Sequence, residues 1–165
     1  MFIRLSNRRV FALLVTVSLG LVAAGLVLGE LAHLHPCHLC NFQRLLYIVL
    51  AFFALCGVLL PGWRRLWCVL VGLTAIGGAI SAVQQSWMQY VPQQPIECGF
   101  GDPTLVERIV DWLGAQWPAM FMVTGFCTSK EWIFLGLSLA NWSVLCFLAL
   151  LGVALWLGCR REAVR

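Results

Sequence analysis

Four long runs of apolar residues, separated by shorter polar stretches, organise this chain. They cover residues 10–30, 41–60, 66–84 and 141–158 and contain almost no charged side chains. A helix that crosses the hydrocarbon core of a bilayer needs about 20 such residues. The pattern therefore predicts an all-α membrane protein, a single domain over residues 1–165 in which four transmembrane helices form one bundle. The first run exceeds the 7–15 apolar residues of a signal peptide, so we expect it to be retained as a span.

The basic residues indicate how the spans are oriented. Most of the 11 lie beside the same ends of the apolar runs, at Arg4, Arg8, Arg9, Arg64, Arg65, Arg160, Arg161 and Arg165. Cytoplasmic segments of membrane proteins are enriched in Lys and Arg. Both termini are therefore predicted to be cytoplasmic, with residues 32–40 and 85–140 forming two loops on the outer face.

Composition agrees with a membrane environment. The chain is 61% hydrophobic and 11% charged, against about 25% charged residues in soluble domains. The net charge of +4 is not gathered into a basic patch interleaved with aromatics. We therefore expect membrane lipid, and not nucleic acid, around this protein.

The long outer loop is predicted to contain a short amphipathic helix over residues 104–117. Thr104 and Glu107 have the spacing of a capping box. The segment carries an apolar stripe and an opposite polar one, formed by Leu105, Ile109, Trp112 and Leu113 and by Glu107, Arg108 and Asp111. Two placements remain open: the helix lies flat on the membrane, or it packs against the bundle.

The eight cysteines divide into two groups on this topology. Four lie in spans or at their cytoplasmic ends, where free cysteine usually behaves as a small buried hydrophobe: Cys56, Cys68, Cys146 and Cys159. The other four lie in the outer loops, in the kind of compartment where disulfides persist: Cys37, Cys40, Cys98 and Cys127. Two cysteines in each loop suggest two disulfides.

Spacing singles out the first outer pair. Cys37-His38-Leu39-Cys40 is a Cys-x-x-Cys sequence, typical of redox-active pairs. Because the second span begins at once, we expect Cys40 in the first turn of a helix, where free backbone N–H groups favour a thiolate. Arg44 follows one turn deeper on the same face. A cation there can stabilise the thiolate together with a negatively charged or carbonyl-bearing ligand, although an interfacial arginine that reaches lipid headgroups is the alternative.

A metal site is the competing interpretation of this stretch. His33, His35 and His38 add ligand types that zinc prefers. A second pair of cysteines at short spacing does not follow, and the order Cys-His-Leu-Cys is not a haem attachment motif. We therefore predict no metal.

Longer motifs resemble the DsbB family, bacterial inner-membrane protein dithiol:quinone oxidoreductases that reoxidise the periplasmic thiol oxidase DsbA. They are Pro36-Cys37-His38-Leu39-Cys40 with Gln43-Arg44, and Gly125-Phe126-Cys127 followed by Trp132 and Phe134-Leu135-Gly136-Leu137. The resemblance implies that Cys37 and Cys40 face a quinone, ubiquinone or menaquinone. It implies that Cys98 and Cys127 face a DsbA-like thioredoxin-fold partner, and that Arg44 binds the quinone.

One position departs from the family. Some members have a histidine near the outer end of the third span, where this chain reads Gln84-Gln85-Ser86, so no role of that histidine transfers here. A vitamin K epoxide reductase-like enzyme is the first rival, but its redox pair sits elsewhere relative to the spans. A non-catalytic membrane protein with structural disulfides is the second, and it leaves Cys40 and Arg44 one turn apart unexplained.

Overall fold

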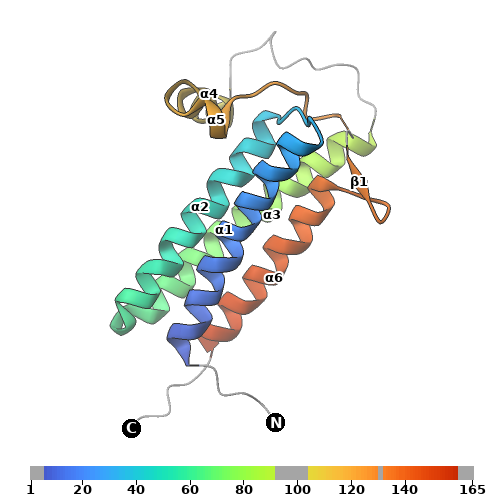
Figure 1. The fold of residues 1–165 in the computed structure, drawn as a ribbon. Coiled ribbons are helices and arrows are strands. Elements are labelled where there is room, and N and C mark those ends of the chain that lie inside the picture. The colour runs from blue at the N-terminus through green and yellow to red at the C-terminus, as the bar shows by residue number, and fades with distance from the viewer. Residues whose placement is uncertain (1–5, 92–103, 130–131, 160–165) are drawn as a thin grey trace.

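The computed structural model describes residues 6–91, 104–129 and 132–159. Four long helices run side by side along one bundle (Figure 1): α1 (Asn7–Leu31), α2 (His38–Leu59), α3 (Arg64–Tyr90) and α6 (Leu139–Cys159). Each is long and apolar enough to cross a bilayer. The predicted four-helix membrane bundle is therefore confirmed.

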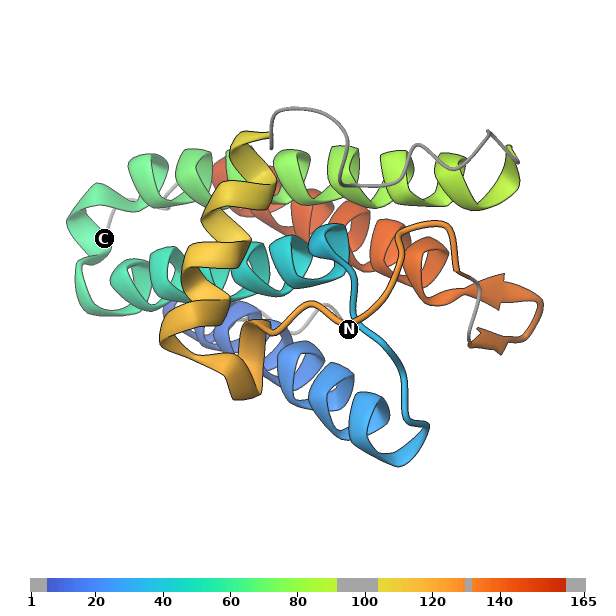
Figure 2. The same ribbon diagram turned by 90° about the horizontal axis from the view of Figure 1, so that it is seen from above.

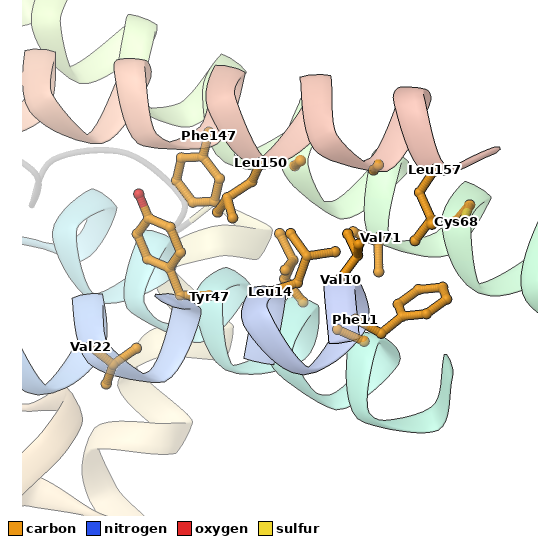
Figure 3. Packing of buried hydrophobic residues seen from close by; sticks show 14 of the residues in the cluster. Val10, Phe11, Leu14, Val22, Tyr47, Cys68, Val71, Phe147, Leu150 and Leu157 are labelled. Atoms are coloured by element: carbon orange, nitrogen blue, oxygen red, sulfur yellow. The ribbon is translucent and has the colours of Figure 1, made fainter. Parts of the chain in front are cut away.

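Helix α2 packs against both α1 and α3, and α3 packs against α6. Large apolar side chains fill the interior between them (Figure 3), and the Tyr47 and Phe147 rings stack with centroids 4.1 Å apart. A Cβ atom at Gly78 would overlap the Phe147 ring, and one at Gly57 would overlap the ring of Phe11. The two glycines thus let neighbouring helices come close enough to bury these rings.

The turn between α2 and α3 begins at a proline that ends the helix. Pro61 cannot continue α2, because it lacks the backbone N–H that the helix would need. A single 3-10 turn, η1 (Pro61–Trp63), follows and connects α2 to α3. The start of α1, the η1 turn and the end of α6 lie at one end of the bundle (Figure 1). The helices therefore alternate in direction, as four successive spans require.

The opposite end carries α4 (Leu105–Gln116) and α5 (Pro118–Phe121), with α4 lying across α2 (Figure 2). The predicted capping box is present: the Thr104 N–H donates to Oε2 of Glu107 at 2.7 Å, and the Glu107 N–H to Oγ1 of Thr104 at 3.4 Å. Val110 and Leu113 are buried, whereas Trp112 stays 61% exposed. The helix therefore packs on the bundle with one face and keeps apolar side chains on the other.

A small hairpin that the sequence analysis did not predict leads into α6. Strands β1 (Ile133–Phe134) and β2 (Leu137–Ser138) pair antiparallel. Leu135 and Gly136 form the turn with φ of 53° and 78°. The Trp142 indole N–H donates to the Phe134 carbonyl at 3.1 Å, which fixes the hairpin to the first turn of the last span.

Candidate active site

The first two predicted site cysteines lie together at the start of α2. Cys37 is the N-cap residue, with an extended backbone, and its sulfur accepts the Cys40 N–H at 3.3 Å. Cys40 therefore occupies the first helical turn, as expected. The two sulfurs are 2.9 Å apart and both thiols are free, so a shift of about 1 Å would bring them to the 2.05 Å of a disulfide.

The outer loops cross so that Cys127 joins this pair. The backbone N–H groups of Thr124 and Gly125 donate to the Pro36 carbonyl at 3.0 and 3.2 Å. A Cβ atom at Gly125 would overlap the His35 carbonyl oxygen, so only glycine permits this close approach. Cys127, 9% exposed, packs against Cys37, which is 1% exposed.

Contact between the sulfurs shifts the pKa values of Cys37 and Cys127 in opposite directions. The pKa of Cys37 is raised, first by its hydrogen bonds to Cys127 and Cys40 and then by burial. The pKa of Cys127 is lowered, mainly by the hydrogen bond from Cys37. With both thiols reduced, Cys127 is therefore the more readily formed thiolate of the two. Exchange between the loops needs a sulfur of one loop in contact with a sulfur of the other, and the packing of Cys127 against Cys37 provides that contact.

Two polar side chains of α2 hold the segment that leads to Cys127. The Asn41 amide N–H donates to the carbonyls of Phe121 and Met122, at 2.9 and 3.2 Å. The Arg44 guanidinium donates to the Met120 carbonyl. Arg44 therefore has a structural partner as well as a place beside Cys40, and the sequence analysis foresaw only the second.

A cavity of about 330 Å³ reaches from Cys40 into the bundle. Residues of α1 and α6, among them Leu21 and Trp142, form apolar walls, while Cys40, Arg44 and Gln85 line its polar end. Its size falls within the roughly 300–1,000 Å³ of small-molecule sites. A flat ring with carbonyl oxygens and an apolar tail matches these walls and this polar end.

Two buried glutamines complete the polar end. Gln43 of α2 and Gln85 of α3 are 5% and 4% exposed and are hydrogen-bonded to each other. The sequence analysis assigned neither a role. Polar residues inside an apolar span are by default functional candidates, and that signal would have found Asn41 and Gln43.

Two other residues that the sequence analysis considered for a site, His38 and Cys98, do not lie among the three sulfurs in the described part of the chain. His38 pairs with Asp111 of α4, 3.0 Å between Nε2 and Oδ1, and so fastens that helix to α2. Cys98 lies outside the described residues. In the described part of the chain, no group of three or more His, Cys, Asp or Glu side chains is arranged to hold a metal.

The span cysteines divide by exposure. Cys68 is buried, Cys56 and Cys146 are half-buried, and Cys159 is exposed. The expectation of a small buried hydrophobe holds for Cys68 and is wrong for Cys159, which lies in the final turn of α6, where the bundle no longer covers it.

Comparisons with known proteins, by family and by individual relative, all give the same description. The family described as disulfide bond formation protein DsbB matches residues 7–157. The chain is 52% identical to disulfide bond formation protein B of Dechloromonas aromatica over 153 residues, 92% of each chain. It is 37% identical to the protein of that name from Aromatoleum aromaticum, over 86% of each chain. With the one from Nitrosomonas europaea it shares 36% identity over 90% of this chain and 93% of the relative.

Proposed function

Because the chain belongs to the DsbB family of disulfide bond formation proteins, we propose that it is a protein dithiol:quinone oxidoreductase. It reoxidises a periplasmic DsbA-like thioredoxin-fold oxidase and passes the electrons to a membrane quinone. The observation that carries the proposal is that Cys37, Cys40 and Cys127 pack together and that Cys40 among them lines the polar end of a mostly apolar cavity. A chain of sulfurs that ends at such a cavity suits electron transfer from a protein to a lipid-soluble acceptor.

The cysteines carry the electron pair inward in four exchanges. A thiolate of the reduced partner attacks Cys98, the Cys98–Cys127 bond breaks, and Cys127 leaves as a thiolate. Cys127 then attacks Cys37, which breaks the Cys37–Cys40 bond and leaves Cys40 as a thiolate. The partner's second thiolate releases the oxidised partner from Cys98, and Cys98 recovers Cys127 from Cys37. Each step is attack by a thiolate on a disulfide sulfur, and the sum leaves Cys37 and Cys40 reduced.

The last step regenerates the Cys37–Cys40 disulfide. When bound, a quinone would supply the acceptor for two electrons and two protons. Arg44 would hold a carbonyl oxygen of the ring and stabilise negative charge both there and on Cys40. Leu21 and Trp142 would cover the ring and the start of its tail.

The proposed location is a bacterial inner membrane, with the sulfurs on the periplasmic side. Arg8, Arg9, Arg64 and Arg65 stand at the start of α1 and α3, at the end of the bundle away from Cys37, Cys40 and Cys127. Such an excess of basic residues marks the cytoplasmic side. Both termini then face the cytoplasm, and the cysteine loops face the compartment where disulfides form.

The test is turnover by the purified full-length chain in lipid nanodiscs. A reduced thioredoxin-fold oxidase is supplied with ubiquinone or menaquinone, and partner disulfide and quinol are both measured. One quinol is expected for each partner disulfide, with no turnover in Cys40→Ser and near-normal turnover in the matched variant Cys56→Ser. Quinol formation that does not depend on Cys40, or partner oxidation without quinol, would overturn the proposal.

A further inference from the structure

Two amides form a relay that ends on a redox sulfur. Nε2 of Gln43 donates to Oε1 of Gln85 at 2.8 Å. Nε2 of Gln85 then donates to the Cys40 sulfur at 2.9 Å and lies 3.6 Å from the Cys37 sulfur. The relay thus joins α2 to α3 and ends at the polar end of the cavity.

The order of donors and acceptors in this relay follows from the orientation of the two amides. A glutamine side chain has one accepting oxygen and one donating nitrogen. Because Gln43 gives its N–H to the oxygen of Gln85, the nitrogen of Gln85 is the end that faces Cys40. A sulfur that accepts an N–H bond is favoured as the thiolate over the thiol. Both amides are nearly inaccessible to water, where such a bond is electrostatically stronger.

We propose that Gln85 is a catalytic residue that stabilises the Cys40 thiolate, and that Gln43 is a positioning residue that keeps the Gln85 amide turned toward the sulfur. The inference rests on the proposed function and deepens it. Arg44 supplies charge beside Cys40 and Gln85 supplies a direct donor. An amide does not titrate, so this donor persists at every pH at which the protein is folded.

The test measures the pH midpoint of Cys40 alkylation in the reduced, full-length protein, with the Cys40 peptide quantified by mass spectrometry. Gln85→Glu places a carboxylate oxygen against the sulfur, and we expect the midpoint to rise by about one to two pH units. Gln84→Glu is the matched control, since Gln84 is the adjacent exposed residue of the same helix, and its midpoint should match the wild type.

Gln43→Glu tests the positioning role. A carboxylate at residue 43 can only accept, so it draws the nitrogen of Gln85 toward itself and turns the oxygen of Gln85 toward Cys40. The midpoint should rise although residue 85 is unchanged. Cys37, Cys127 and Arg44 interact with Cys40, and His35 lines the same cavity. All four are retained in these variants.

Equal midpoints in Gln85→Glu and Gln84→Glu would overturn the inference. If Gln85→Glu does not yield folded protein, Gln85→Leu decides, since it removes the donor without adding charge: a raised midpoint supports the role and an unchanged one refutes it. Neither quinone nor partner enters this measurement. Failure of the proposed function would instead appear as wild-type protein that does not form quinol.

Discussion

Replacing Arg44 by Met removes the cation at the polar end of the cavity, and we expect it to impair quinone reduction more than thiol exchange. The guanidinium lines the cavity with Cys40 and donates to the Met120 carbonyl. A fixed cation there lowers the cost of a Cys40 thiolate and of negative charge on a bound carbonyl oxygen. A hydrogen bond to a charged group contributes about 1.5–3 kcal/mol, so quinone reduction should slow roughly 10- to 100-fold, with a higher KM for quinone.

Asn41→Leu is the matched control, because Asn41 anchors the same segment without carrying charge. It should loosen the approach to Cys127 and slow exchange between Cys127 and Cys37, while the KM for quinone stays near the wild-type value. Arg44→Lys should recover only part of the loss, since an ammonium lacks the planar fork that can address a carbonyl and a sulfur together.

The assay separates the two steps. Quinol formation at saturating partner reports the quinone step, and rapid mixing with reduced partner in the absence of quinone reports thiol exchange. If Arg44→Met leaves the quinone kinetics unchanged, or slows only mixed-disulfide formation at Cys98, the guanidinium is an anchor for Met120 and the charge argument is wrong.

Other changes test the sulfurs and the crossing of the loops. Turnover, followed as partner oxidation, should disappear in each single Ser variant of the site cysteines Cys37, Cys40, Cys98 and Cys127. It should largely survive when the span cysteines Cys56, Cys68, Cys146 and Cys159 all become Ala. The opposite result would reassign the pairs. A partner without its resolving cysteine should be trapped on Cys98 as a mixed disulfide visible on a non-reducing gel; trapping on Cys37 would reverse the electron flow. Cys37→Ala removes the donor that lowers the pKa of Cys127, so the pH midpoint of Cys127 alkylation should rise, and an unchanged midpoint contradicts the hydrogen bond. Gly125→Ala should push the loop off the His35 carbonyl and slow Cys127–Cys37 exchange, with quinone affinity retained; normal exchange would show that the crossing does not position Cys127.

The parts of the fold that follow from local pattern were predictable. A bilayer demands about 20 apolar residues per span, so the four runs identify four helices without knowledge of their packing. The place of Cys40 in the first turn of α2 was predictable as well, because the apolar run begins directly after the Cys-x-x-Cys pair. The hairpin at 133–138 was not, because two residues per strand give no alternation to detect. Its turn is local chemistry, with Gly136 at positive φ, but that glycine alone specifies no partner strand.

The active site was predictable only where one segment carries it. Cys40 and Arg44 share a helix, so their separation is set by helical geometry. The contact of Gln85 with Cys40 depends on which face of α3 meets α2, and neither span's pattern encodes that choice. Yet the choice is constrained, because a polar group buried in an apolar bundle must find a partner there. Asn41 and Arg44 bond the carbonyls before Cys127, and Gln43 bonds the oxygen of Gln85. The Gln85 nitrogen is then directed to the Cys40 sulfur, so the bonds that hold the polar residues of the span also bring the sulfur chemistry together.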